Sequence, residues 1–281
     1  MTPGERERGR DAAPARTAVP VALTIAGSDS GGGAGIQADL KTFEAFAVFG
    51  TTAITAVTAQ NTRGVFAVAV LEPSMIRAQI RAVYEDLAPR AAKTGMLANA
   101  AGVGAVAGAL RETGLAPVVV DPVMVASSGD RLLDEDAVET LRERLLPLAA
   151  ILTPNVPEAE LLLGRTLSSV EALREAAPAL AELGPAAVLL KGGHLPGPEI
   201  VDVAWDGREL REFRAPRIDT RHTHGTGCTL SAAIAAGLAR GADRWTAIEM
   251  AIDYTRRAIA SAPGLGSGHG PLAHRVPVEP R

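Results

Sequence analysis

A short glycine-rich segment directly before a helix-forming stretch holds the only cysteine of the chain. The segment reads Thr223-His224-Gly225-Thr226-Gly227-Cys228, and small or apolar residues follow it to about residue 239. Free backbone N–H groups at the start of such a helix, together with the helix dipole, favour an anion. A cysteine at this position is expected to have a lowered pKa and could accept a proton from an alcohol. The alternative interpretation is a glycine turn with a small buried residue at Cys228.

A second glycine cluster follows the first apolar run of the chain. It reads Gly27-Ser28-Asp29-Ser30-Gly31-Gly32-Gly33-Ala34-Gly35. This cluster is not a Walker A loop, because no Gly-Lys-Ser/Thr ends it and none occurs elsewhere. Its glycines would let the backbone approach a ligand closely, and Asp39, one turn into the next helix, could reach the same crevice. A flexible loop beside an exposed acid is the alternative interpretation.

Oxygen-bearing side chains follow two further strand-like runs. Asp121 ends the run that begins at Val118, and Asn155 and Glu158 follow the run at residues 151–152. Together they suit a Mg²⁺ ion that keeps most of its waters, although each is also an ordinary helix cap. Lys191 ends another apolar run just before two glycines, where its charge could meet a phosphate. A surface lysine is the alternative interpretation there.

Two other patterns are weaker indicators of chemistry. Gly102-Val103-Gly104-Ala105-Val106-Ala107 matches the dinucleotide fingerprint, and Asp121 lies near the expected acidic position. However, small and polar residues 99–101 precede it, where an apolar strand should run into the first glycine. His222 and His224 could suggest a metal, but two histidines without a third ligand are more typical of a loop.

The elements that would position these residues alternate along the chain. Short apolar runs are the predicted strands: Val21–Ala26, Thr52–Thr58, Val65–Leu71, Ala91–Thr94, Val118–Asp121, Ile151–Leu152, Ala187–Lys191 and Ile200–Trp205. Longer patterns predict helices near residues 34–48, 73–87, 100–113, 134–146, 156–163, 169–183, 227–239 and 244–261. This alternation predicts an α/β fold with a mostly parallel sheet covered by helices on both faces. Residues 199–213 resemble a hairpin that turns at Asp206-Gly207. Because ligands gather at the carboxyl ends of such strands, the residues above are well placed for a common site.

Composition narrows the class of protein. A chain of 281 residues, 47% of them hydrophobic, can bury the core of one large α/β domain or of two small ones. The net charge of −4 and the small number of aromatic residues (five Phe, two Trp and two Tyr) argue against nucleic acid as a partner. No apolar run reaches the roughly 18 residues that a membrane span needs. We therefore expect neither nucleic acid nor a membrane as a partner.

The same features suggest how the chain is organised. The single cysteine excludes an intrachain disulfide and a cysteine-rich metal site, and it points to the cytoplasm. Residues 1–18 alternate charges with Gly, Pro and Ala, which predicts a disordered tail. Residues 19–262 contain neither a repeat nor a linker and are predicted to form one domain, and the glycine-rich residues 263–281 a loop and tail. We also expect a homodimer.

Taken together, these motifs resemble the hydroxymethylpyrimidine/phosphomethylpyrimidine kinases of thiamine biosynthesis, within the ribokinase-like superfamily. The resemblance runs in order from about residue 20 to residue 261. Besides the Cys228 loop, its segments are Leu23-Thr24-Ile25-Ala26-Gly27-Ser28-Asp29, Gly32-Gly33-Ala34-Gly35-Ile36-Gln37-Ala38-Asp39-Leu40-Lys41, Ala59-Gln60-Asn61-Thr62-Arg63-Gly64-Val65, Lys93-Thr94-Gly95-Met96-Leu97, Asp121-Pro122-Val123-Met124, Thr153-Pro154-Asn155-Val156-Pro157-Glu158-Ala159 and Lys191-Gly192-Gly193-His194.

The resemblance implies a three-layer α/β/α ribokinase-like fold and a set of roles. The residues expected to line a pyrimidine pocket are Gly27, Asp39, Gln60, Met96 and Val123. The residues expected to hold Mg²⁺ and its waters are Asp121, Asn155 and Glu158. Lys191 would contact a phosphate of ATP. The backbone of Gly225, Thr226 and Gly227 would form an anion hole beside Cys228, which would replace the aspartate base usual in the superfamily.

The implied reaction phosphorylates 4-amino-5-hydroxymethyl-2-methylpyrimidine with ATP to its monophosphate and then to its pyrophosphate. The nearest alternative is a pyridoxal or pyridoxine kinase, which shares the fold and a hydroxymethyl acceptor. Gln60 favours the pyrimidine, because its amide offers both a donor and an acceptor to an aminopyrimidine edge. A nicotinamide-dependent oxidoreductase would rest on the Gly102 pattern alone. A non-catalytic binder of a vitamin precursor would need neither Cys228 nor the acids assigned to Mg²⁺.

Overall fold

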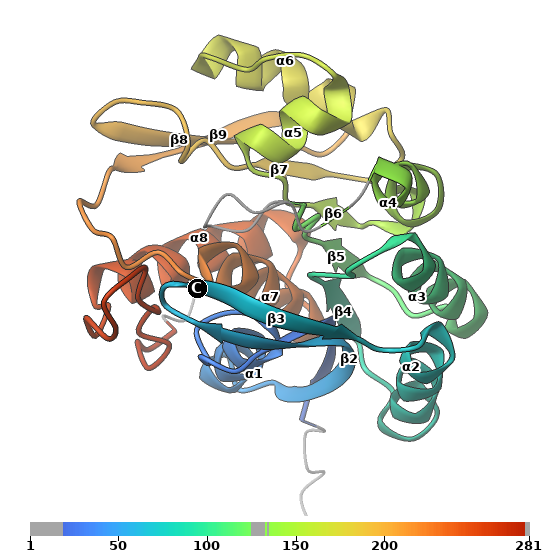
Figure 1. The fold of residues 1–281 in the computed structure, drawn as a ribbon. Helices are drawn as coiled ribbons and strands as arrows, with labels where there is room; N and C mark the ends of the chain where they lie inside the picture. The colour runs from blue at the N-terminus through green and yellow to red at the C-terminus, as the bar shows by residue number, and fades with distance from the viewer. Residues whose placement is uncertain (1–18, 125–132, 134, 279–281) are drawn as a thin grey trace, which may run out of the picture.

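A computed structural model describes residues 19–124, 133 and 135–278 of the chain (Figure 1). The predicted N-terminal tail of residues 1–18, the first residue of the helix predicted at 134–146, and residues 279–281 lie outside the described residues. The described chain forms one nine-stranded sheet in the order β3-β2-β1-β4-β5-β6-β7-β8-β9. The strands are β1 (Val21–Asp29), β2 (Phe49–Asn61), β3 (Gly64–Val70), β4 (Ala91–Thr94), β5 (Val118–Val120), β6 (Ile151–Leu152), β7 (Val188–Leu190), β8 (Glu199–Trp205) and β9 (Leu210–Pro216).

The middle of the sheet is parallel and its edges are antiparallel. Strands β2, β1, β4, β5, β6 and β7 pair in parallel, whereas β3, β8 and β9 join through antiparallel pairs. All three residues of β5 and all four of β4 are buried, as expected for strands covered on both faces. The predicted mostly parallel sheet is therefore confirmed.

Helices cover both faces of the sheet (Figure 1). One layer holds α1 (Gly35–Ala45), α7 (Thr226–Ala239) and α8 (Arg244–Ala260). The other holds α2 (Pro73–Leu87), α3 (Ala100–Thr113), α4 (Glu135–Thr140), α5 (Val156–Leu163) and α6 (Val170–Ala181). Side chains of β1 alternate between two separate cores, since Ala22 packs under α1, α7 and α8 while Leu23 and Ile25 pack under the opposite layer. This is the predicted three-layer α/β/α arrangement.

The elements differ from the sequence prediction in several places, of which two are the clearest. The helix expected at 134–146 changes after α4 into a π-helical turn at Leu141–Leu145 and a 3₁₀ turn at Leu146–Leu148. Pro147 lies in this second turn, and a proline has no N–H with which to continue an α-helix. Strand β2 begins three residues before the predicted start and ends three residues after the predicted end. The hairpin of β8 and β9 is confirmed, and Asp206 Oδ1 caps its turn by accepting bonds from the N–H groups of Arg208 and Glu209.

The segment after α8 is irregular, as its glycines suggest, but it packs onto the body of the protein. Leu272 and His274 are buried. The N–H of His269 donates to the Thr62 carbonyl in the turn between β2 and β3 at 2.8 Å. Nε2 of His274 lies 3.0 Å from Oγ1 of Thr229 on α7. The segment thus joins the β2–β3 hairpin to α7. Within the described ranges, no helix is both long and apolar enough to cross a membrane.

Candidate active site

The carboxyl ends of the parallel strands open into a cavity of about 1570 Å³. Residues from β1, β2, β8, β9, α7 and α8, and from the loops after β4, β5, β6 and β7, line it. Of the site residues named from the sequence, the lining includes Gly27, Gln60, Met96, Asp121, Val123, Asn155, Glu158, Lys191, Gly225, Thr226, Gly227 and Cys228. Residues far apart in the sequence are therefore brought together at one place.

Asp39 is the exception among the named residues. Its side chain is fully buried between α1 and the sheet, and it is not part of the cavity lining. Oγ1 of Thr24 donates to Asp39 Oδ2 at 2.6 Å, and Nζ of Lys93 lies 3.1 Å from the same oxygen. Burial raises the pKa of the Asp39 carboxyl, and Lys93 opposes that rise. The expectation that Asp39 lines the ligand pocket is corrected: α1 turns this carboxylate inward to a buried lysine, Lys93, whose role was not predicted from the sequence.

The two glycine loops touch each other beside the start of α7. Gly225 precedes the helix with a φ of 86°, in the left-handed region. A Cβ atom at Gly225 would lie 1.9 Å from the carbonyl oxygen of Gly33, so only glycine fits. A Cβ atom at Gly227 would lie 3.3 Å from Asp121 Oδ2 and 3.4 Å from Lys191 Nζ. The first turn of α7 therefore lies directly against a carboxylate and an ammonium group.

Cys228 lies in this first turn and lines the cavity. Burial raises the pKa of its thiol to about 11, Asp39 and Asp121 raise it as well, and Lys93 lowers it. The expectation of a lowered pKa is wrong, because burial outweighs the favourable helix terminus. With its pKa raised to about 11, Cys228 is a thiol at neutral pH.

Asp121, Glu158 and Lys191 form a charged group that we call the Lys191 end of the cavity. Lys191 Nζ lies 3.2 Å from Asp121 Oδ1, which Oγ1 of Thr153 also approaches at 3.3 Å. Burial raises the pKa of the Glu158 carboxyl, Asp121 raises it further, and Lys191 counteracts both. Two neighbouring carboxylates with a single lysine between them suit an additional cation.

Asn155 and Glu158 also cap α5 (Val156–Leu163). Asn155 Oδ1 accepts the Glu158 N–H at 2.9 Å, and Glu158 Oε2 accepts the Asn155 N–H at 2.8 Å. The capping role considered for both residues is thus confirmed, and it occupies the amide oxygen of Asn155. Across the residues that the structure describes, no three His, Cys, Asp or Glu side chains form a cluster that could hold a metal.

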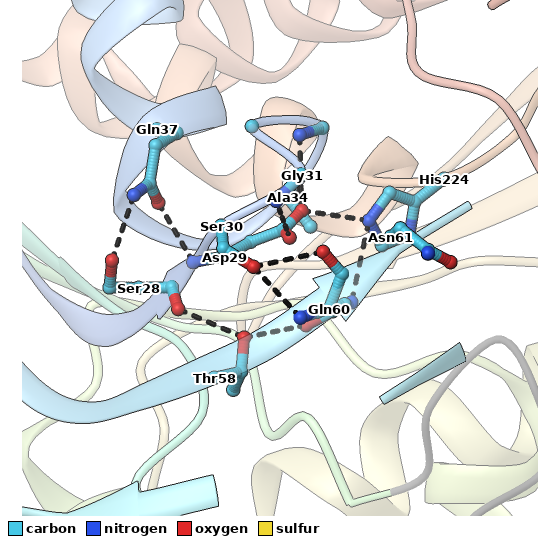
Figure 2. A network of polar contacts seen from close by, with 12 residues as sticks. Ser28, Asp29, Ser30, Gly31, Ala34, Gln37, Thr58, Gln60, Asn61 and His224 are labelled. Carbon is cyan, nitrogen blue, oxygen red and sulfur yellow. Dashed lines mark hydrogen bonds and ion pairs between the residues drawn. The ribbon is translucent and has the colours of Figure 1, made fainter. Parts of the chain in front are cut away.

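A polar network builds the opposite side of the cavity, which we call the Gln60 end; its residues are Asp29, Thr58, Gln60 and His224 (Figure 2). Asp29 Oδ2 accepts bonds from the N–H groups of Gly33 and Ala34 and lies 2.9 Å from Nε2 of His224. Burial alone would raise the pKa of Asp29, but the His224 contact and the backbone N–H groups bring it below its usual value. The pair ties the loop after β1 to the loop before α7.

Neither Asp29 nor His224 was predicted to be a site residue, and His224 was predicted to be a loop residue. An Asp followed by Ser and glycines is typical of a turn in which the carboxylate accepts nearby backbone N–H groups, and that signal was available for Asp29. No local signal marks His224 as its partner. The two residues lie 195 positions apart in the chain.

Gln60 extends this network into the cavity (Figure 2). Its Oε1 accepts a bond from Oγ1 of Thr58 at 3.0 Å, and its Nε2 lies 3.5 Å from Nε2 of His224. A histidine nitrogen that donates its proton to the Asp29 carboxylate cannot also accept a hydrogen from Gln60. The Gln60 amide therefore keeps N–H groups for a ligand.

The Gly102 pattern is not a nucleotide-binding loop. Gly102 lies inside α3 rather than between a strand and a helix, and its N–H donates to the Asn99 side chain that caps this helix. A Cβ atom at Gly102 would lie 2.3 Å from the Leu97 carbonyl oxygen. The glycine is required for close backbone packing, and the dinucleotide interpretation is wrong.

Comparison with known proteins agrees with this arrangement. The family model described as phosphomethylpyrimidine kinase matches residues 29–273. The hydroxymethylpyrimidine/phosphomethylpyrimidine kinase of Bacillus subtilis (strain 168) is 52% identical over 254 residues, which cover 90% of this chain and 94% of that protein. Among solved structures, pyridoxal kinase of Bacillus subtilis in complex with ADP is similar with a TM-score of 0.85 and 40% identity over 91% of this chain and 97% of that chain. Phosphomethylpyrimidine kinase of Clostridium difficile 630 has a TM-score of 0.77 and 44% identity over 85% of this chain and 99% of that chain. The chain belongs to the phosphomethylpyrimidine kinase family.

Proposed function

We propose that this kinase transfers the terminal phosphoryl group of ATP to the hydroxymethyl oxygen of 4-amino-5-hydroxymethyl-2-methylpyrimidine, and then phosphorylates the resulting monophosphate. The observation that carries the proposal is the position of Cys228. It lies on the first turn of α7, in a short segment that contacts the Gln60 end through His224 and lies against the Lys191 end at Gly227. An acceptor held by Gln60 would thus meet a phosphate held by Lys191 beside a group that can take a proton.

The Lys191 end would bind the phosphates of ATP. Its lysine and the backbone N–H groups at the start of α7 both favour negative charge. Phosphoryl transfer needs mainly positioning and neutralisation of charge on the moving group. Apolar side chains of β9 and α8, among them Phe213, Ile252 and Ile259, line the cavity farther along and would suit the adenine ring.

Asp121 and Glu158 fit a magnesium ion. Their carboxylates are close enough for Asp121 to raise the pKa of Glu158, which a cation would relieve. Since Asn155 uses its amide oxygen as a cap, these two acids would hold the ion, partly through water. When bound, Mg²⁺ neutralises phosphate charge. The two acids also orient neighbouring groups. Asp121 pairs with Lys191, and Glu158 accepts the N–H of Met124.

The proton of the alcohol would pass to Cys228. In the first step the hydroxymethyl oxygen forms a bond to the terminal phosphorus of ATP, the bond from that phosphorus to the bridging oxygen breaks, and ADP leaves with the electron pair. The hydroxyl proton moves to the thiolate form of Cys228, which is the minor form at neutral pH, and the sulfur becomes a thiol. In the second step the attacking phosphate is already ionised, so we expect little need for a base.

A pyridoxal kinase is the second candidate, because the solved pyridoxal kinase of Bacillus subtilis shares the fold at 40% identity. The hydroxymethylpyrimidine/phosphomethylpyrimidine kinases are more similar in sequence, as the 52% identity over 254 residues illustrates. Gln60 also favours the pyrimidine, whose amino group and ring nitrogen match an amide. The oxidoreductase alternative loses its basis, because its glycines lie inside α3.

The test is consumption of ATP with a panel of alcohols, followed by the mass of each product. We expect hydroxymethylpyrimidine to gain first one and then a second phosphoryl group. We expect pyridoxine to react more slowly. A preference for pyridoxine would establish the second candidate, and no transfer to either alcohol would refute the assignment.

We further propose that the enzyme acts in the cytoplasm as a homodimer. The cytoplasmic proposal is supported by the single cysteine, which allows no intrachain disulfide. The dimer proposal is supported by the exposed apolar side chains of Phe66, Val68 and Val70 on the edge strand β3, which a second copy could cover. Light scattering of wild type and Phe66→Glu would test it, because the glutamate should yield monomers.

A further inference from the structure

A lysine and an aspartate form an ion pair in the interior beneath the cavity. Lys93 Nζ lies 3.1 Å from Asp39 Oδ2 and 3.3 Å from Asp39 Oδ1, and both side chains are 0% exposed. Thr24 Oγ1 donates to the same carboxylate. Buried ion pairs of this kind rarely add net stability, because removing both charges from water offsets their attraction. Stability alone therefore does not explain why the interior holds this pair.

The pair lies on the side of the sheet that faces the first turn of α7. Side chains alternate along β4, so Lys93 points the same way as Ala91, which packs in the core under α1, α7 and α8. A Cβ atom at Gly95 would lie 3.1 Å from Lys93 Nζ and 3.0 Å from Cβ of Ala26. Ala26 itself lines the cavity. The ammonium group therefore lies close behind a residue of the cavity lining.

Four charged side chains, each from a different part of the fold, favour or disfavour the thiolate form of Cys228. Lys93 on β4 favours its thiolate, whereas Asp39 on α1 and Asp121 after β5 disfavour it. Lys191, after β7, is attracted to the same thiolate. Burial would lower the pKa of the Lys93 ammonium, but Asp39, Cys228 and Asp121 together raise it, so Lys93 stays charged. Because α7 packs against both β4, which carries Lys93, and α1, which carries Asp39, both charges lie on the interior side of the helix that carries Cys228.

We propose that Lys93 is a positioning residue of this kinase: its buried ammonium group, held by Asp39 and Thr24, stabilises the thiolate of Cys228 from beneath the cavity. Asp39 limits the effect, because its negative charge offsets part of the ammonium charge. The inference rests on the proposed function, in which Cys228 accepts the proton of the alcohol. It predicts that loss of Lys93 and loss of Asp39 change the amount of Cys228 thiolate at a given pH in opposite directions.

The test uses the fact that Cys228 is the only cysteine. Alkylation of the full chain by iodoacetamide, followed by mass spectrometry over a series of pH values, reports the thiolate of this one residue without any kinase assay. We expect Lys93→Met to move the alkylation curve to higher pH and to slow the reaction about tenfold or more at a fixed pH, since a nearby opposite charge shifts a pKa by about one unit or more. Asp39→Asn should move the curve to lower pH.

Two further variants separate charge from damage to the fold. Thr24→Val removes the hydroxyl that holds Asp39 without changing any charge, so its alkylation curve should stay within about twofold of wild type. Lys93→Met combined with Asp39→Leu removes both charges and leaves an apolar interior, and its curve should lie between those of the single variants. Circular dichroism and thermal denaturation identify any variant that has not folded.

Curves that shift in the same direction for Lys93→Met and Asp39→Asn, or that do not shift, would overturn the proposal. So would an effect of Thr24→Val as large as that of Lys93→Met. The proposed function is judged separately, by the rate of Cys228→Ala. If that variant kept the wild-type rate while the alkylation curves moved as expected, the coupling to Lys93 would stand and the proton-accepting role of Cys228 would fall.

Discussion

The two ends of the cavity differ in how the charge of their carboxylates is stabilised. At the Gln60 end, Asp29 accepts bonds from backbone N–H groups and from His224, and its pKa lies below the usual value. At the Lys191 end, burial and a neighbouring acid raise the pKa of Glu158, and Lys191 only partly compensates. The Asp29 carboxylate at the Gln60 end has its partners before a ligand binds, whereas the charges at the Lys191 end become balanced only when a cation is added. The Gln60 end is therefore suited to hold the acceptor in a fixed position. The Lys191 end is suited to bind charged ligands, namely the phosphates of ATP and a metal ion.

The largest effect is expected where the two ends meet. Cys228→Ala should reduce the rate of the first phosphorylation by roughly 10²–10⁴-fold, because a positioned general base contributes about that much. Binding of ATP and of the alcohol should persist, since alanine leaves the backbone at the start of α7 in place. Measurement of kcat for the alcohol, with binding constants for both substrates, checks the prediction. A rate equal to wild type would remove Cys228 from the chemistry.

The dependence of kcat/KM on pH, measured for wild type and for Cys228→Ala, tests the same role of Cys228 in a second way. Burial raises the pKa of the Cys228 thiol to about 11, so below that pH its thiolate fraction grows as the pH rises. We expect kcat/KM for the first step to increase about tenfold per pH unit in wild type and to lose that slope in Cys228→Ala. The second step, whose acceptor is an ionised phosphate, should be nearly independent of Cys228.

Glu158→Gln should weaken the Lys191 end and leave the Gln60 end intact. We expect use of Mg²⁺-ATP to fall by roughly 10- to 100-fold, as is common when a group that orients a metal site is lost, with partial rescue by extra Mg²⁺. Glutamine can still accept the N–H of Asn155, so α5 should keep its cap. The rate as a function of Mg²⁺ concentration is the measurement.

The matched control for that experiment is Glu175→Gln on α6, whose side chain is 72% exposed and is not part of the cavity lining. It should behave as wild type at every Mg²⁺ concentration. If Glu158→Gln also keeps the wild-type Mg²⁺ dependence, Glu158 is only a helix cap, and Asp121 would have to hold the ion without it.

Gln60→Met should alter substrate choice at the opposite end. A lost hydrogen bond that leaves a partner unpaired costs about 1–3 kcal/mol, or roughly ten- to a hundredfold in kcat/KM. Hydroxymethylpyrimidine should lose this much because its amino group and ring nitrogen both match the amide, whereas pyridoxine should lose less. The ratio of kcat/KM for the two alcohols decides the matter, and the KM for ATP serves as the control. An unchanged ratio would mean that another residue reads the ring.

The sheet could be predicted from the sequence, whereas the side-chain pairs that build the two ends of the cavity and its interior could not. The parallel sheet followed from apolar runs such as that at Val118, because a strand buried on both faces leaves a local signal. The pairs Asp29 with His224 and Asp39 with Lys93 did not, since they join residues 195 and 54 positions apart. Cys228 shows the same limit: its helix terminus was visible in the sequence, but the burial that raises its pKa to about 11 depends on the packing of several elements.

The smallest effect is expected from His224→Ala, which removes the contact between His224 and Asp29 at the Gln60 end. The pKa of Asp29 is lowered in the folded protein from a usual value of 3.8. A carboxyl with a lowered pKa adds stability above its unfolded pKa and loses that contribution as the pH falls through the folded value. We therefore expect the variant to lose about 1.5 kcal/mol of unfolding free energy at neutral pH, typical of a hydrogen bond to a charged group, and a smaller amount below the usual pKa of Asp29.

Chemical denaturation at both pH values measures the difference, and His194→Ala, a change at an exposed histidine that also lines the cavity, is the control. A loss of stability that does not depend on pH would mean that His224 contributes through packing rather than through the carboxylate. Full stability with a reduced rate would instead show that His224 acts on the reaction rather than on the stability of the fold.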